Sequence, residues 1–346
     1  MQTRILLLSG CRCIALVPAK RKIIPRQGGY MDTNKFRTIV QGLAESYRSG
    51  FGVNDSGLSG IPDRASIAKL CDLMLHVVFP GFFAGQQQLQ VQVHWVALRR
   101  LIADLEDDLH RQLQRAYRFQ ERCQGVSEKD EKDFLECIDA VTTSFLQSLP
   151  EVRRLLESDV QAAYENDPSA PGAEEIIVSY PCIEAIAVQR LAHRLYQLEV
   201  PFLPRMMTEV AHSRTGIDIH PGATIGDHFF IDHGTGVVIG ETTTIGSHVV
   251  LYHGVTLGAF NPLSRNEEGM LERGQANKRH PDLEDHVTVY PGATILGGRT
   301  RIGHHCIIGG NAWVTRSVAP WSTVTMADPD LTIRQNSKQG PGDFAI

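Results

Sequence analysis

The sequence predicts an α+β protein with two dissimilar domains: an N-terminal all-α helical domain and a C-terminal parallel β-helix of hexapeptide repeats. Two observations lead to this prediction. Between residues 32 and 212, apolar residues recur three and four positions apart, as they do in amphipathic helices. From residue 217 onward the apolar period changes to six, and a fixed internal period indicates a repeat architecture.

The helical spacing is clearest in three stretches of the N-terminal part, Ala65–Val78, Leu89–Arg122 and Glu131–Leu149. Pro150 is the first of several prolines that punctuate the sequence after them, and a proline inside a helix usually ends or bends it. No residue between 32 and 150 has a recognisable chemical role, so this part predicts a helical scaffold with solvated charged faces. We place the domain boundaries at residues 31–214 for the helices and 215–325 for the β-helix.

The six-residue period runs in two blocks of aliphatic residues. They fall at Ile219, Ile225, Ile231, Ile239, Ile245, Leu251 and Leu257, and then at Leu283, Val289, Ile295, Ile302, Ile308 and Val314. Each hexapeptide is expected to form one flat face, with three faces to a coil. The aliphatic side chain should point inward, and glycine or small residues should occupy the tight corners.

A polar interruption separates the two blocks and is expected to form a loop over residues 258–282. Long loops within compact repeats are usually either functional or disordered. This loop ends in Lys278-Arg279-His280-Pro281, which favours function. The planar guanidinium of Arg279, next to His280, suits the carboxylate of an amino-acid substrate.

His233 stands out among the many histidines of the C-terminal part, most of which we expect at coil corners. Glycines follow it at positions 234 and 236, so a ligand can approach the backbone there closely. Asp218 lies fifteen residues earlier, nearly one coil of about eighteen residues, so the two side chains could stack. A carboxylate that orients a histidine makes it a general base.

Zinc binding is the competing interpretation of the histidines, with His233, His253 and His280 as ligands that converge between subunits. The regular histidine spacing of such a site is not evident, and acidic residues sit beside these candidates. We therefore expect no metal.

Composition narrows the class of protein further. Lys plus Arg is 34 and Asp plus Glu is 39, and the resulting net charge of −5 disfavours a nucleic-acid binder. The seven cysteines contain no Cys-x-x-Cys pair, which favours reduced thiols in the cytoplasm. The sequence contains no apolar run of eighteen residues, so no membrane span is expected. Residues 1–30 are expected to be a disordered extension or to precede a true start at Met31, and a targeting segment is the minority alternative.

Several motifs together resemble the serine O-acetyltransferase family. They are Gly216–Pro221, Ile231–Thr242, Gly254–Gly258, Lys278–Pro281, and upstream Asp159–Ala162, Asn166–Pro168 and Pro181–Tyr196. The resemblance covers roughly residues 150–325. The family's short glycine-rich loop before Arg-His-Pro is replaced here by a long one, so the chain looks like a long-loop subtype.

The resemblance implies a left-handed β-helix, a trimer or dimer of trimers with active sites between neighbouring coils, and acetyl transfer from acetyl-CoA to L-serine in cysteine biosynthesis. Acetyl-CoA would be a co-substrate, with no permanently bound cofactor. By motif, His233 would be the base and Asp218 its partner. The amino group of serine would be held by Asp159 and Asp232, and its carboxylate by Arg279 and His280. The CoA channel would be lined by Gly258, Ala259, Pro291 and Gly310.

Two alternatives stay open: an acetyltransferase with another hydroxyl acceptor, such as a sugar, and a non-catalytic regulatory partner of cysteine synthase. The resemblance also makes feedback by cysteine plausible, because cysteine shares the amino and carboxylate groups of serine. Residues 326–346 are expected to be a flexible tail. Its terminal Ile346 would insert into the next enzyme, O-acetylserine sulfhydrylase, as in the family.

Overall fold

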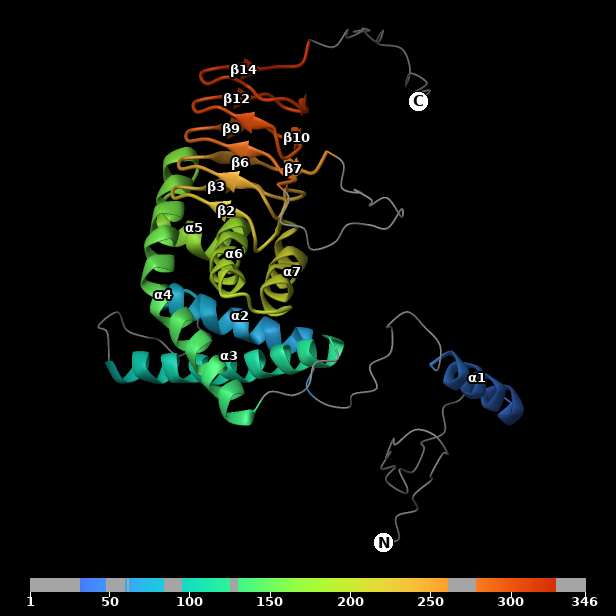
Figure 1. Cartoon of the computed structure of the whole chain (residues 1–346). Coiled ribbons are helices and arrows are strands. Elements are labelled where there is room, and N and C mark those ends of the chain that lie inside the picture. Colours follow the sequence, from blue (N-terminus) through green and yellow to red (C-terminus); the bar gives the residue numbers. More distant parts are fainter. Residues whose placement is uncertain are drawn as a thin grey trace, which may run out of the picture. The chain divides into compact units, whose positions relative to one another are not determined.

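Figure 1 shows the structure, a computed structural model that describes residues 32–47, 60, 62–83, 95–124, 130–260 and 278–327. The chain divides into two units, Met1–Ser59 and Gly60–Ile346. The predicted extension at residues 1–30, most of the loop 258–282 and nearly all of the tail 326–346 lie outside the described residues.

The first unit contains one described helix, α1 (Thr33–Ser46). Asp32 caps it, because its carboxylate accepts a hydrogen bond from the backbone N–H of Asn34 at 2.9 Å. The apolar residues Phe36, Ile39 and Leu43 follow the spacing of one helix face and remain exposed.

The second unit begins with a helical part. Its helices are α2 (Arg64–Val78), α3 (Trp95–Gln124), α4 (Glu131–Asn166), α5 (Ala173–Ser179), α6 (Pro181–Gln197) and α7 (Leu203–Thr215). The carboxylates of Asp63 and Asp130 accept hydrogen bonds from the first-turn N–H groups of α2 and α4. Within the described ranges, no helix combines the length and apolar character that crossing a membrane requires.

The interruption predicted at Pro150 is wrong, because α4 runs through this residue without ending. Proline removes one hydrogen bond of the helix interior. However, Leu149 and Val152 are both buried on either side of it, so packing outweighs the lost bond.

After α7 the chain winds into a three-faced parallel β-helix, as the six-residue period predicts. Face A consists of β1 (Asp218–Ile219), β4 (Val238–Ile239), β7 (Thr256–Gly258), β10 (Thr294–Leu296) and β13 (Trp313–Val314). Face B consists of β2 (Thr224–Ile225), β5 (Thr244–Ile245), β8 (Asp282–Leu283) and β11 (Arg301–Ile302). Face C consists of β3 (Phe230–Asp232), β6 (Val250–Tyr252), β9 (Thr288–Val289), β12 (Ile307–Ile308) and β14 (Thr323–Val324).

The predicted aliphatic series forms the core of this β-helix. All of its members are buried, and each pairs with its counterpart one coil away, as Ile239 does with Ile219 and Leu257. The chain turns between faces at three corners, which we name after the faces that they join: the A–B, B–C and C–A corners. Helices α4, α6 and α7 pack against the first coil, at the opposite end from β14 (Figure 1).

Candidate active site

His233 lies at the C–A corner, directly after β3. Its backbone is in the left-handed region, with a φ of 58°, and its side chain is 74% exposed. Gly234 follows with a φ of 79°, and a Cβ at this position would lie 2.4 Å from Cδ1 of Ile217. The tight corner therefore requires glycine after the histidine and leaves the imidazole accessible to a ligand.

Two neighbouring side chains give the His233 corner its chemistry. Oδ2 of Asp232 lies 3.8 Å from Nε2 of His233, and its side chain is only 23% exposed. The ring of His253, one coil further on, has its centroid 5.8 Å from that of His233. The exposed imidazole can accept a proton, and the carboxylate beside it can attract a cationic amino group.

Asp167 also belongs to this corner, and sequence reasoning gave it no role. Its carboxylate accepts hydrogen bonds from Ser169 Oγ at 2.6 Å and from the hydroxyl of Tyr180 at 2.5 Å. These bonds from Ser169 and Tyr180 lower the pKa of the Asp167 carboxyl, and the nearby charge of His233 lowers it further. The signal was present in Asn166-Asp167-Pro168, where a turn residue directly follows the end of α4.

The assignment of Asp159 to the substrate needs correction, because this residue is completely buried. Its carboxylate pairs with Arg190, with Oδ2 2.6 Å from Nε and Oδ1 2.7 Å from Nη2, and also accepts from the N–H of Phe229 at 3.0 Å. Both oxygens therefore have protein partners and no exposed surface is left for a ligand. Asp159 anchors α4 to α6 and to the first coil.

The sequence predicts that Asp218 and His233 stack one coil apart, and this pairing is also wrong. The residue one coil away from Asp218 is Val238, because the first coil is longer than the regular eighteen residues. Asp218 nevertheless begins face A beside the C–A corner, since its N–H bonds to the carbonyl of Val237 at 2.9 Å. Its carboxylate lies 3.5 Å from Nη1 of Arg205. Its role as partner of His233 stays a prediction.

Arg279 and His280 lie at the A–B corner, where Thr242 holds them. The hydroxyl oxygen of Thr242 accepts from the backbone N–H groups of Arg279 at 2.9 Å and His280 at 3.1 Å. The guanidinium of Arg279 forms an ion pair with Glu241. The His280 ring packs so closely on Gly240 that a Cβ there would lie 2.0 Å from its Cδ2.

His280 is held as a neutral hydrogen-bond donor. Its Nδ1 accepts from the backbone N–H of Thr242 at 3.1 Å, which assigns the ring proton to Nε2. Burial, followed by the positive charge of Arg279, lowers the pKa of His280 to about 4. Near neutral pH this corner therefore offers one guanidinium and one uncharged N–H donor, a combination that suits a carboxylate.

Tyr196 of α6 is a further residue of the A–B corner that the sequence did not single out. Its hydroxyl donates to Oε1 of Glu241 at 3.0 Å, while Oε2 of the same carboxylate pairs with Arg279. Glu241 therefore connects the helical part to the guanidinium. The only hint in the sequence was the position of Tyr196 at the end of the helical motif Pro181–Tyr196.

The four residues predicted for CoA divide between the same two corners. Pro291 and Gly310 lie at the C–A corner, where the Pro291 carbonyl accepts from the N–H of Asn311 at 2.9 Å. Gly258 and Ala259 lie where face A enters the A–B corner, and the Gly258 carbonyl accepts from the N–H of Gly297 at 3.0 Å. The three histidines considered for zinc are divided likewise, because His280 is at the A–B corner and His233 and His253 are at the C–A corner.

Face A thus separates two half-sites. A hexapeptide face at about 3.3 Å per residue is up to about 20 Å wide, much more than one amino-acid substrate. One half-site has an exposed imidazole with acidic neighbours, and the other has a guanidinium beside a neutral imidazole. Together with the hexapeptide coils they define an acyltransferase of the hexapeptide-repeat class.

Comparison with known proteins identifies the family. No protein-family model matches the chain. The plasmid serine acetyltransferase of Synechococcus elongatus is 46% identical over 267 residues, which are 77% of this chain and 82% of that protein. The serine acetyltransferase of Mycobacterium tuberculosis is 43% identical over 193 residues, or 55% of this chain and 78% of its own. The chain belongs to the serine acetyltransferase family, whose members are acyltransferases.

Solved structures agree with this membership. Serine acetyltransferase 1 of Entamoeba histolytica, in complex with L-cysteine, superposes with a TM-score of 0.63 at 35% identity, covering 85% of this chain and 98% of its own. Isoform 3 of the same organism, in complex with cysteine, gives 0.64 at 30% identity, covering 88% of this chain and 96% of its own. The implied left-handed β-helix following an N-terminal helical domain is thereby confirmed.

Proposed function

We propose that the chain transfers the acetyl group of acetyl-CoA to the hydroxyl of L-serine, giving O-acetylserine and free CoA. The observation that carries the proposal is the pairing of an exposed imidazole near carboxylates with a separate guanidinium and neutral imidazole. Serine needs both sets of groups, because it presents a hydroxyl, an ammonium and a carboxylate. A sugar acceptor would have no use for Arg279.

In the proposed mechanism His233 takes the proton of the serine hydroxyl as its oxygen attacks the thioester carbon. The C–S bond breaks when the tetrahedral intermediate collapses, and the imidazolium returns its proton to the leaving thiolate of CoA. Asp218 orients His233 in this scheme. Backbone N–H groups near Gly258 stabilise the oxyanion.

Serine itself is positioned by its two charged groups. Asp232 and Asp167 hold the ammonium, and Asp167 here takes the role first given to the buried Asp159. Arg279 binds the carboxylate together with Nε2–H of His280. CoA runs along Pro291 and Gly310 on one side and Gly258 and Ala259 on the other.

We further propose that each active site forms between two copies of the chain, in a trimer or a dimer of trimers. The C–A corner of one copy would face the A–B corner of its neighbour. This arrangement accounts for the division of both the serine and the CoA groups between two corners of one chain. The contributed residues then meet across the interface.

The test is release of the CoA thiol with L-serine as acceptor. His233→Ala should reduce turnover by about 10²–10⁴-fold, as expected for a lost general base. Arg279→Ala should instead raise the KM for serine, because a guanidinium–carboxylate contact binds ground and transition states alike. Activity with a sugar but not with serine would reject the proposal.

The shared site has its own test, in which His233→Ala and Arg279→Ala chains are unfolded together and reassembled as mixed oligomers. In an equal mixture about one quarter of the interfaces join two intact corners, so about a quarter of wild-type activity should return. Separately reassembled variants are the control. No recovery in the mixture would place both corners in one site of a single chain.

Three further proposals follow from family membership. The chain acts in the cytoplasm, in keeping with the free thiols of the five cysteines that the structure describes. L-Cysteine, bound in the Entamoeba relatives, competes for the serine site. The tail, outside the described residues, places Ile346 in O-acetylserine sulfhydrylase. A titration of that enzyme with and without Ile346 decides this last point: equal binding would reject it.

A further inference from the structure

The third corner of the β-helix, B–C, takes no part in the proposed chemistry but carries a column of aromatic rings. One ring comes from each coil, and their centroids lie 4.2, 4.7, 4.5 and 4.0 Å apart. All five residues have a φ between 52° and 61°. The column consists of His228, His248, His286, His305 and Trp321.

The first histidine of this column has an unsatisfied nitrogen. Nδ1 of His228 is buried and has no hydrogen-bond partner. Oδ1 of Asp227 lies 3.6 Å from this nitrogen, beyond hydrogen-bonding distance. A buried polar atom without a partner is costly, and such atoms in folded proteins often mark a missing water or ion.

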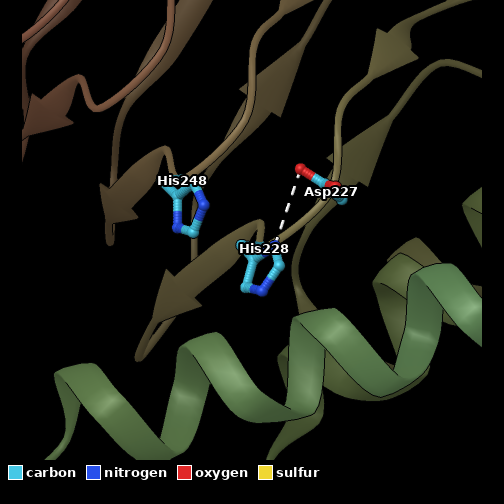
Figure 2. Close-up of side chains that lie close together, drawn as sticks. All are labelled: Asp227, His228 and His248. Carbon is cyan, nitrogen blue, oxygen red and sulfur yellow. Dashed lines mark ion pairs between the residues drawn. The ribbon is translucent and has the colours of Figure 1, made fainter.

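We propose that Asp227, His228 and His248 bind one divalent transition-metal ion of the zinc type. Figure 2 shows the three side chains at adjacent corners of the first two coils. One ligand atom from each lies within 4.8 Å of the others. Zn–N and Zn–O bonds of about 2.0–2.1 Å at the tetrahedral angle put two ligand atoms about 3.4 Å apart. The distance of 3.6 Å between Nδ1 of His228 and Oδ1 of Asp227 is therefore close to that required for two ligands of one ion.

His248 has to turn to complete the site. Its ring is stacked on that of His228 with an interplanar angle of 20°, whereas a metal ion lies in the plane of each imidazole that binds it. Two stacked rings cannot share an ion, so a rotation of His248 out of the column accompanies binding. The residue is exposed, which leaves room for this rotation.

The charges around the group favour a cation. Among the residues that the structure describes, no lysine or arginine forms an ion pair with Asp227. The charge of Asp227 acts on Arg154 over a longer distance, but the guanidinium of Arg154 donates hydrogen bonds to Glu151 at 2.9 and 3.0 Å. The Asp227 carboxylate has a hydrogen bond from the side chain of Ser247 but no lysine or arginine partner in the described part of the chain. Asp227, His228 and His248 thus offer two imidazoles and one carboxylate, a donor set typical of zinc.

A second group with similar spacing, Glu209, His212 and Asp218, is the less suitable of the two. Arg205 forms ion pairs with both of its carboxylates, so a cation would have to displace the guanidinium. This group is the alternative location that the metal-binding experiment has to exclude.

The proposed ion joins the first coil to the second beside the helical part. The backbone N–H of His228 donates to Oγ of Ser158 on α4 at 3.1 Å, so the site lies where this helix meets the β-helix. Its role is structural, because the groups proposed for serine lie at the other two corners.

Full-length, untagged protein, freed of metal with a chelator, tests the proposal. Titration with Co²⁺ should produce the visible absorption of low-coordinate cobalt with one ion per chain, and Zn²⁺ should abolish it. His228→Asn, which tolerates the positive φ, and Asp227→Asn should each weaken binding more than about tenfold. Serine acetylation by both variants should stay at the wild-type level and so report an intact fold.

His305→Asn is the matched control, since it removes a ring from the same column at the same backbone conformation. It should bind Co²⁺ as the wild type does. Equal affinity of wild type and His228→Asn, or loss of binding in His212→Asn instead, would overturn the proposal. An anomalous diffraction peak for zinc between Asp227, His228 and His248 would support it, and a peak elsewhere alone would refute it.

Discussion

Replacing Asp159 by asparagine separates a structural role from a substrate-binding role for this carboxylate. The change keeps the shape of the side chain and removes its charge. Arg190 then remains only 4% exposed with a positive charge that the carbonyls of Ile225 and Gly226, at 3.1 and 2.7 Å, must balance alone. Removing one partner of a buried ion pair costs about 3–5 kcal/mol.

No screening by solvent reduces this figure, because Asp159 is 0% exposed. The loss is a large part of the 5–15 kcal/mol or so that stabilises a typical protein. Urea denaturation followed by circular dichroism, at one fixed protein concentration, measures it for wild type and variant. The KM for serine of the folded variant should be unchanged.

The control is Asp167→Asn, which alters a partly exposed carboxylate just past the end of the same helix. It should change stability by only about 1 kcal/mol, for weakened hydrogen bonds, and should lower kcat/KM for serine. The reasoning is refuted if Asp159→Asn loses less than about 1 kcal/mol. It is equally refuted if the Asp159 variant raises the serine KM while Asp167→Asn does not.

Three further predictions concern the A–B corner. Gly240→Ala should raise the serine KM about tenfold or more in steady-state kinetics, because its Cβ would displace the His280 ring; an unchanged KM would contradict the close packing. His280→Gln should lower activity without moving the acidic limb of the pH profile of kcat/KM, since a pKa of about 4 keeps the ring neutral above pH 5 or so. An acidic limb that shifts in this variant would disprove the assignment of a neutral ring. In the wild type, the folding stability that the neutral ring contributes is full above about pH 6.5 and is lost as the pH falls toward 4. Tyr196→Phe removes the 3.0 Å bond to Glu241 and should raise the serine KM a few-fold at nearly constant kcat, through a less restrained Arg279; a fall in kcat alone would argue against this link.

The repeat was predictable from the sequence because its signal is local and recurs. An aliphatic residue every sixth position, with small residues at the corners, describes a backbone that the chain repeats coil after coil. All of these aliphatic residues are buried as expected. The pair of Arg279 and His280 at the A–B corner was also predictable from a local signal, because the two residues are adjacent in sequence.

The errors arose where the geometry is not periodic. The register of Asp218 was misjudged because the first coil is longer than the regular eighteen residues, and a residue count cannot say which part of the coil absorbs the insertion. Asp159 and Asp167 lie in neighbouring motifs, and only burial distinguishes an ion-paired anchor from an accessible carboxylate. The continuation of α4 through Pro150 depended on packing that no local pattern records.

The length of α4 has a mechanical consequence. At about 1.5 Å per residue its 36 residues form a rod of about 54 Å, with Asp167 directly beyond its C-terminal end. The buried Asp159–Arg190 pair fixes the C-terminal part of this rod to α6. Pro150, with its missing hydrogen bond, is the point at which bending costs least. A molecule that binds the N-terminal half of α4 would therefore bend the helix at Pro150 and leave the spacing between the Asp167 carboxylate and His233 unchanged.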